Sequence, residues 1–252
     1  MPKNILTAKV VRREDLTDDL FKLWLEPKTT EKFIFKPGQY CTIGLKKIWR
    51  AYSIVSAPHE EYIELFVELV PDGKLTPLLH KLKLGDSVDL LPKAKGIFTF
   101  DPKYKNHVMV ATVTGVVPYI SILRDFVYRS LNFKLPREEA DRNFYILQGA
   151  SYMDEFGYYE ELSHLEDTHP VCDMTVIYEP TISRPGEERN AGWQHLETGR
   201  VNTLVEDFLK GALLKLEKTL IYACGHPEMI AKVKEIAAAG KWNFKEERFW
   251  KG

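Results

Sequence analysis

The sequence has few cysteines, and their positions exclude several kinds of site. Only Cys41, Cys172 and Cys224 occur among the 252 residues, and they lie far apart. Zinc and iron-sulfur sites draw on cysteines that are a few residues apart, so we expect no metal centre. A chain of this length hides roughly 70% of its unfolded surface on folding, so its core needs no disulfides.

Long apolar runs and a net charge are also lacking. No apolar run reaches the roughly 18 residues of a membrane helix, and the first residues lead into a charged strand rather than a signal sequence. The formal net charge is −1, which gives no reason to expect a nucleic acid partner. Residues 1–103 hold 17 Lys and Arg against 14 Asp and Glu, and the remainder hold 18 against 22. We expect a cytoplasmic protein, not bound to membranes, whose first part is mildly basic.

The chain up to about Phe100 consists of short β-segments separated by turn residues. Lys36-Pro37-Gly38, Pro71-Asp72-Gly73 and Leu84-Gly85-Asp86 mark three turns. Many short strands of this kind predict a small antiparallel β-barrel with one helix over 77–82. Predicted strands cover 20–25, 39–44, 51–55, 63–70 and 87–91.

The pattern changes near Asp101-Pro102-Lys103, so we expect domains at 1–102 and 103–252. Beyond this point apolar runs alternate with amphipathic segments of helical length, which predicts an α/β domain with a parallel sheet and helices on both faces. A ligand should bind at the carboxyl ends of such strands. Strands are predicted over 107–113, 144–148, 174–178 and 220–223, and helices over 119–131, 154–165, 201–209 and 228–239. Pro180–Gly199 is the longest connection, and long loops in compact domains are often functional.

Two segments of the first domain carry residues suited to a nucleotide cofactor. Arg50-Ala51-Tyr52-Ser53 presents a cation, an aromatic ring and a hydroxyl in succession, which can bind a phosphate and flank a flat ring. Gly73-Lys74-Leu75-Thr76 opens the predicted helix, where backbone N–H groups can hold a pyrophosphate. The alternative is an ordinary strand with an exposed arginine and a half-buried tyrosine.

With these segments in place, the chain resembles the ferredoxin-NADP reductase family, most closely its bacterial flavodoxin/ferredoxin reductase branch. The resemblance covers nearly the whole chain and implies an FAD-binding antiparallel barrel followed by an NADP-binding α/β domain. It is carried by Lys36-Pro37-Gly38-Gln39-Tyr40, Arg50-Ala51-Tyr52-Ser53, Pro71–Thr76, Leu84-Gly85-Asp86, Thr112–Pro118, Ser183-Arg184, Thr198-Gly199-Arg200 and Cys224-Gly225-His226-Pro227.

The resemblance implies how the first domain holds FAD. Arg50 would contact the FAD phosphates, Tyr52 would pack on the isoalloxazine, and Ser53 would hydrogen-bond near its reactive edge. Ala51 completes this motif. The ring edges would be held by the backbone of Phe66, Val67, Glu68 and Leu69, and the pyrophosphate would be lined by Lys74, Leu75 and Thr76.

Two segments of the second domain match the nicotinamide end of the family's site. Ala111–Pro118, which includes Thr114, follows a strand and opens a helix, so its backbone could face a dinucleotide. The family usually has glycine where Val113 stands and a small residue where Val117 stands, so these side chains either narrow the nicotinamide approach or pack beneath it. Cys224 would lie beside the nicotinamide ring and aid hydride transfer. Without the resemblance, it would be interpreted as a buried structural cysteine.

The resemblance also implies how the second domain would recognise NADP(H). Ser183, Arg184 and Arg200 match the residues that hold its 2′-phosphate. Ser151 stands where the bacterial pattern often has another arginine, and Glu187 and Glu188 lie near Arg184, so the choice between NADPH and NADH stays open.

The C-terminal aromatic residues Phe249 and Trp250 match residues that fold back on the FAD in the bacterial branch. Which of them packs on the isoalloxazine is left open. The alternative is a small hydrophobic anchor onto the sheet.

The resulting hypothesis is a monomeric FAD enzyme that exchanges a hydride with NADP(H) and single electrons with a separate ferredoxin or flavodoxin, with Ser53 and Cys224 at the reaction centre. Such carriers are acidic, and lysines of the first domain could dock one. One alternative is a flavin reductase subunit of an oxygenase or hydrogenase complex. Another is a non-catalytic nucleotide-binding subunit. The docking lysines would be Lys46, Lys47, Lys81, Lys83, Lys93 and Lys95.

Overall fold

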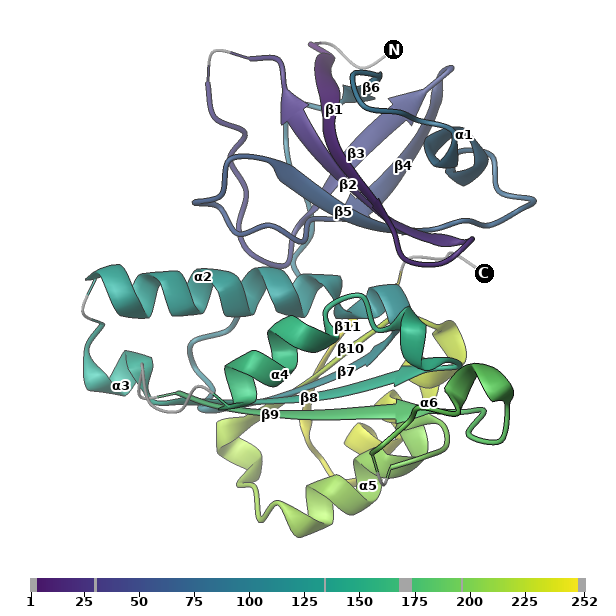
Figure 1. The fold of residues 1–252 in the computed structure, drawn as a ribbon. Coiled ribbons are helices and arrows are strands. Elements are labelled where there is room, and N and C mark those ends of the chain that lie inside the picture. The colour runs from purple at the N-terminus through teal and green to yellow at the C-terminus, as the bar shows by residue number, and fades with distance from the viewer. Residues whose placement is uncertain (1–3, 30, 134, 168–173, 196, 249–252) are drawn as a thin grey trace. The chain divides into compact units, whose positions relative to one another are not determined.

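The computed structural model describes residues 4–29, 31–133, 135–167, 174–195 and 197–248. The chain divides into two compact units (Figure 1). Unit 1 consists of Met1–Phe100 and Val117–Asp125, and unit 2 consists of Asp101–Val116 and Phe126–Gly252.

Unit 1 is a six-stranded antiparallel sheet that curls into a nearly closed barrel. The strands follow the order β4-β3-β6-β1-β2-β5, and the two end strands, β4 and β5, approach each other. The only α-helix with all its residues in this unit, in the part of the chain described, is the short α1 (Thr76–His80). The strands are β1 (Leu6–Asp15), β2 (Leu20–Pro27), β3 (Tyr40–Leu45), β4 (Ile48–Ser53), β5 (Ile63–Glu68) and β6 (Ser87–Leu90).

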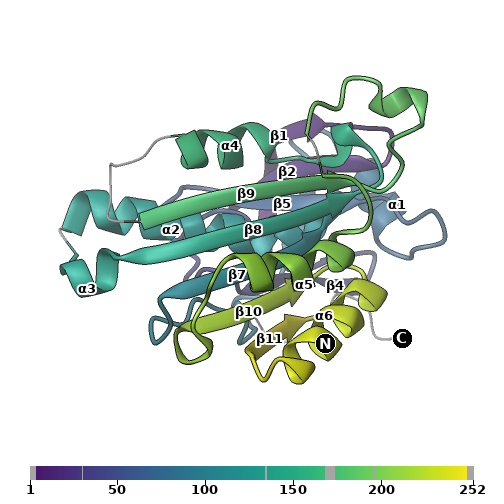
Figure 2. The same ribbon diagram turned by 90° about the horizontal axis from the view of Figure 1, so that it is seen from below.

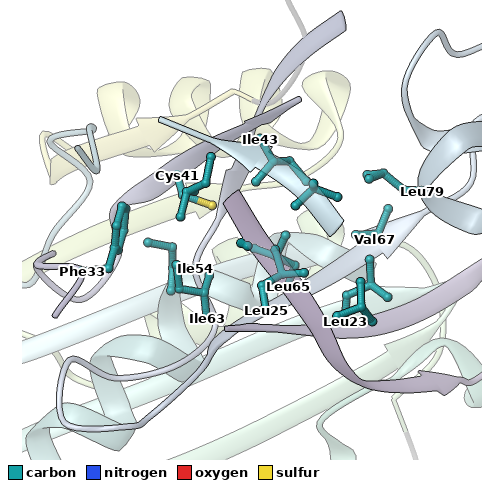
Figure 3. Packing of buried hydrophobic residues seen from close by; sticks show 14 of the residues in the cluster. Leu23, Leu25, Phe33, Cys41, Ile43, Ile54, Ile63, Leu65, Val67 and Leu79 are labelled. Atoms are coloured by element: carbon teal, nitrogen blue, oxygen red, sulfur yellow. The ribbon is translucent and has the colours of Figure 1, made fainter. Parts of the chain in front are cut away.

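Apolar residues that alternate along these strands form the core of unit 1 (Figure 3). Leu23 and Leu25 of β2 lie opposite Leu65 and Ile63 of β5, and all four are buried. Burial of each such side chain contributes about 1.5–3 kcal/mol to folding. Cys41 of β3 lies in the same cluster, and its complete burial raises the pKa of its thiol to about 12. Cys41 is thus a core residue whose thiol stays protonated.

Unit 2 contains a five-stranded parallel sheet with the order β11-β10-β7-β8-β9. Helices α5 and α6 cover one face and α4 covers the other (Figures 1 and 2). The strands are β7 (Asn106–Thr112), β8 (Arg142–Ala150), β9 (Met174–Ile182), β10 (Thr219–Cys224) and β11 (Asn243–Glu247). The α-helices of this unit are α3 (Arg137–Ala140), α4 (Tyr159–Asp167), α5 (Val201–Gly211) and α6 (Pro227–Ala239), and α2 (Val117–Phe133) begins in unit 1 and ends in unit 2.

The predicted fold class, an antiparallel barrel followed by a parallel α/β sheet, is confirmed. Several element bounds differ. The helix predicted over 154–165 is interrupted, because the Glu155 carboxylate accepts hydrogen bonds from the Ser151 and Tyr152 N–H groups and closes a separate 3₁₀ turn at Met153–Glu155. The strand predicted to end at Val113 ends at Thr112 instead. Strand β11 was not predicted.

Candidate functional site

The carboxyl ends of β7 and β10, which are neighbouring parallel strands of unit 2, lead into two loops in close contact. Thr112 Oγ1 accepts a hydrogen bond of 2.7 Å from the His226 N–H group. A Cβ on Gly115 would lie 2.1 Å from the Cys224 carbonyl oxygen, so only glycine fits without a shift in the backbone. Gly225 has φ +127°, a conformation that favours glycine. These loops lie at the carboxyl edge of the sheet, which is where α/β proteins bind ligands.

Val113 begins the 3₁₀ turn Val113–Val116 with φ +41°, which is unusual for a β-branched residue. Its carbonyl accepts a hydrogen bond of 3.2 Å from Gln148 Nε2, and Gln148 Oε1 accepts one of 2.8 Å from the Tyr178 hydroxyl. The Val113 side chain packs against a cluster that includes Phe156 and Ile182. The strained turn is therefore held by buried neighbours on β8 and β9. Thr114, the predicted site residue, lies half-buried in the same turn.

Cys224 ends β10 and is fully buried, which raises the pKa of its thiol well above the ordinary value. The thiol therefore carries its proton at neutral pH. Glu247 occupies the paired position on β11, and burial raises the pKa of its carboxyl group. Glu247 could not be recognised from the sequence, because β11 is mostly polar and half-buried and so has no apolar pattern.

Arg184 follows β9 and meets Tyr152, which follows β8. Its Nη1 donates a hydrogen bond of 2.7 Å to the Tyr152 hydroxyl, which donates one of 2.6 Å to Glu187 Oε2. Glu187 Oε1 also lies 3.5 Å from Arg184 Nη1. The bond to Glu187 raises the pKa of the Tyr152 hydroxyl.

A second arginine lies on the same tyrosine. The Arg189 guanidinium is 4.1 Å from the centroid of the Tyr152 ring, and it forms an ion pair of 2.7 Å with Asp154. Neither Tyr152 nor Arg189 was predicted as a site residue. The only signal for Arg189 was the length of the Pro180–Gly199 connection, and nothing in the sequence marked Tyr152, because its contacts depend on the neighbouring strands β8 and β9.

The other predicted arginine, Arg200, precedes α5 and has different neighbours. Its Nη1 lies 3.5 Å from the Glu228 carboxylate of α6, and both side chains are exposed. Gly199 donates to the Ile182 carbonyl, which joins this segment to the end of β9 just before Ser183. The backbones around Ser183 and Arg200 therefore lie side by side, while Arg184 and Arg200 have different carboxylate partners.

In unit 1, the predicted cofactor residues lie on the two strands that nearly close the barrel. Arg50, Tyr52 and Ser53 belong to β4, and Phe66, Val67 and Glu68 belong to β5. Arg50 and Ala51 are exposed, while Ser53 is buried. Tyr52 packs partly against the barrel core, and its burial raises the pKa of its hydroxyl. Leu69 directly follows β5 and is half-buried.

The loop from Val70 to Thr76 is closed on itself at the start of α1. Thr76 Oγ1 donates to the Val70 carbonyl at 3.1 Å and accepts from the Val70 N–H group at 3.0 Å. A Cβ on Gly73 would lie 2.8 Å from the Val70 carbonyl oxygen, so the turn requires glycine or a shift in the backbone. Lys74 is exposed and Leu75 is buried. The Thr76 hydroxyl thus holds the loop shape.

The remaining expectations concern the C-terminal aromatic residues, metal sites and membrane-spanning helices. Phe249 and Trp250 lie outside the described residues. Within the described ranges, no cluster of three or more His, Cys, Asp or Glu is arranged to hold a metal ion. Among the same residues, no helix has the length and apolar character needed to span a membrane.

Comparisons with known proteins match two domain families in succession along the chain. Residues 7–96 match the oxidoreductase FAD-binding domain and residues 109–235 match the oxidoreductase NAD-binding domain. The chain is 31% identical over 235 residues to the flavodoxin/ferredoxin–NADP reductase of Escherichia coli, and this match covers 89% of this chain and 86% of that protein. It is 29% identical over 247 residues to the ferredoxin–NADP reductase of Pseudomonas aeruginosa, covering 92% and 89%.

Among solved structures, a ferredoxin NADP+ reductase from Neisseria gonorrhoeae with bound FAD and NADP superposes with a TM-score of 0.78 at 23% identity, over 99% of this chain and 100% of that chain. This likeness shows the fold. The extended sequence identity and the two domain matches show that the chain is an oxidoreductase of the ferredoxin/flavodoxin–NADP reductase family, with an FAD-binding and an NAD(P)-binding domain.

Proposed function

We propose that this protein exchanges a hydride between NADP(H) and FAD and passes single electrons to or from a ferredoxin or flavodoxin. The observation that carries the proposal is the pair of interlocked loops, Thr112–Val116 and Cys224–His226, at the carboxyl ends of two neighbouring parallel strands. Backbone donors at such a position suit a dinucleotide. In this proposal residues 1–102 hold FAD and residues 103–252 hold NADP(H).

The residues of unit 1 fit a flavin dinucleotide. An exposed arginine, a half-buried tyrosine and a buried serine follow one another on β4, and the tight Val70–Thr76 loop opens a helix nearby in the chain. Arg50 would bind phosphate, Tyr52 would pack on the ring, and Ser53 would hydrogen-bond its edge. The backbone of Phe66–Leu69 would hold the ring, and Lys74–Thr76 would line the pyrophosphate. When bound, FAD supplies the exchange between paired and single electrons.

The residues of unit 2 would position the nicotinamide without acting as strong acids or bases. The turn that contains Thr114 would offer backbone N–H groups, and its shape is held by the Gln148 and Tyr178 side chains. Cys224 would lie beside the ring with its thiol protonated, because burial raises its pKa. Ser183, Arg184 and Arg200 would bind the 2′-phosphate. The roles of Phe249 and Trp250 stay predictions.

The electron carrier is proposed from charge. All six lysines named above as docking residues, including Lys46 and Lys93, are exposed in unit 1. An acidic carrier would therefore meet an excess of positive charge, and turnover should fall as ionic strength rises. The monomeric state and the cytoplasmic location stay predictions.

The purified protein tests the proposal. It should be yellow, NADPH should bleach the flavin absorbance without oxygen, and a ferredoxin or flavodoxin should restore it. Flavin that NADPH cannot reduce would instead support a non-catalytic subunit, and reduced flavin that only an oxygenase or hydrogenase component reoxidises would support the subunit alternative. The variant Arg50→Gln should lose FAD during gel filtration, whereas Lys93→Gln, which removes the same charge elsewhere in unit 1, should retain it.

A further inference from the structure

The loop that carries Arg184 is built rigidly against the end of β8. Asn190, which is 2% exposed, donates hydrogen bonds to the carbonyls of Ser151 at 3.0 Å and Arg184 at 2.9 Å. Its Oδ1 accepts one of 2.8 Å from the Met153 N–H group. The Glu187 carbonyl in turn accepts a hydrogen bond from the Asn190 N–H group. The position of Glu187 beside Arg184 is therefore defined by a buried side chain.

The Glu187 carboxylate interacts with two groups that suit an anion. One oxygen accepts a hydrogen bond of 2.6 Å from the Tyr152 hydroxyl, and the other lies 3.5 Å from Arg184 Nη1. A tyrosine hydroxyl and a guanidinium are groups that bind phosphate oxygens. Glu187 therefore uses the Tyr152 hydroxyl and Arg184 Nη1, two groups that could otherwise bind a phosphate.

The neighbouring charges do not compensate for this carboxylate. Arg189, the second cation on the Tyr152 ring, is already paired with Asp154 through Nε and Nη2, each at 2.7 Å. A phosphate monoester carries a charge of about −1.5 to −2 at neutral pH, so it would both displace Glu187 and be repelled by it.

We propose that Glu187 is a specificity-determining residue that competes with the 2′-phosphate of NADP(H) for Arg184 and Tyr152, so that this enzyme discriminates weakly between NADPH and NADH. The inference rests on the proposed function, which brings the dinucleotide to this end of the sheet. It implies that the Glu187 carboxylate, rather than the serine that replaces an arginine at position 151, limits the preference for NADPH.

The test compares Glu187→Gln with Glu188→Gln in the FAD-loaded protein. Both variants remove one negative charge, but the Glu188 side chain makes no hydrogen bond or ion pair in the described part of the chain. Binding of 2′,5′-ADP, which carries the extra phosphate, and of 5′-AMP, which lacks it, is measured by calorimetry at low salt. The kcat/KM ratio of NADPH to NADH is measured alongside.

Glu187→Gln should bind 2′,5′-ADP about tenfold more tightly, as expected for a half-exposed carboxylate near a doubly charged group, and should raise the kcat/KM ratio similarly. Binding of 5′-AMP should change less than about twofold, and Glu188→Gln should change neither ligand's affinity by more than that. In an Arg184→Met background the gain from Glu187→Gln should shrink, because the two residues act through each other.

Two outcomes would overturn the inference. One is an unchanged ratio in Glu187→Gln while both dinucleotides still reduce the flavin, which leaves the proposed function intact. The other is an equal gain in Glu188→Gln, which would mean that only the overall charge matters. Flavin that neither NADPH nor NADH can reduce would refute the proposed function itself, together with this inference.

Discussion

Replacing Gly225 by alanine tests whether the two loops of unit 2 interlock as closely as described. Gly225 has φ +127°, and a Cβ there would lie 2.2 Å from Thr112 Oγ1 and 2.9 Å from the Thr112 nitrogen. In the variant, alanine would have an unfavourable backbone conformation, and its Cβ would overlap with Thr112 at the end of β7. Relief of the overlap would break the 2.7 Å hydrogen bond between His226 N–H and Thr112 Oγ1.

The expected loss follows from these three contributions. The backbone conformation costs about 1–3 kcal/mol for a residue other than glycine. Overpacking adds about 1–3 kcal/mol, and the lost hydrogen bond adds about 1 kcal/mol. The free energy of unfolding should therefore fall by about 3–7 kcal/mol, a large part of the stability of a typical domain.

Alanine variants of two other glycines of unit 2 distinguish the backbone contribution from the overlap. Gly199 also has positive φ, +110°, but the nearest atom to its Cβ would be Thr203 Oγ1 at 3.8 Å. Gly199→Ala should therefore lose only the backbone part, about 1–3 kcal/mol. Gly211 ends α5 with no neighbouring atom within 4 Å, so Gly211→Ala should be neutral or stabilise by up to about 1 kcal/mol.

The three variants are compared by urea unfolding followed by far-UV circular dichroism. Equal slopes would show that the midpoints report stability differences. The reasoning would be refuted if Gly225→Ala lost no more stability than Gly199→Ala, because the overlap with Thr112 would then be absent from the folded protein.

Two further predictions concern buried polar groups. Burial lowers the pKa of His107 from 6.5 to about 3 in the folded chain. Between these two pH values the histidine is protonated in the unfolded chain but not in the folded chain. The free energy of unfolding should therefore fall by up to about 1.4 kcal/mol for each pH unit below 6.5. His107→Phe keeps the stacking on Phe144 but cannot be protonated. In this variant the urea midpoint should depend less on pH between about 6.5 and 4. Arg124 pairs at 2.6 Å with Glu64, which is 2% exposed, so Arg124→Met should cost about 3–5 kcal/mol. The double variant with Glu64→Leu should regain most of this loss in the same assay, and an unaffected single variant would contradict the prediction.

Much of the fold could be predicted because buried strands have clear patterns. Strand β10 is entirely buried and apolar from Leu220 to Ala223, and helix α5 buries Val201, Val205 and Leu209 on one face. Strand β11 could not be predicted, because its five residues are polar or half-buried at the edge of the sheet. The early break before α4 depends on the Glu155 side chain, which no periodicity reveals.

The site shows the same division between local and distant signals. The turns after Thr112 and Cys224 could be located from sequence, because glycine and proline follow apolar strand segments there, but their role in binding a dinucleotide stays a prediction. Tyr152 could not be assigned to Arg184, since 31 intervening residues hide a contact made by neighbouring strands. The positive φ of Val113 was also hidden, because a valine predicts the opposite conformation.

These contrasts separate the two ends of the proposed dinucleotide site. As proposed, the nicotinamide end would depend on backbone atoms, glycines and the buried, protonated thiol of Cys224, so side-chain charge would contribute little to it. The 2′-phosphate end would depend on Arg184 and Glu187, whose side chains are 52% and 51% exposed. Exposed side chains can be exchanged at small cost in stability, whereas the glycine contacts cannot. The choice between NADPH and NADH should therefore change with single surface substitutions, while the geometry for hydride transfer tolerates few.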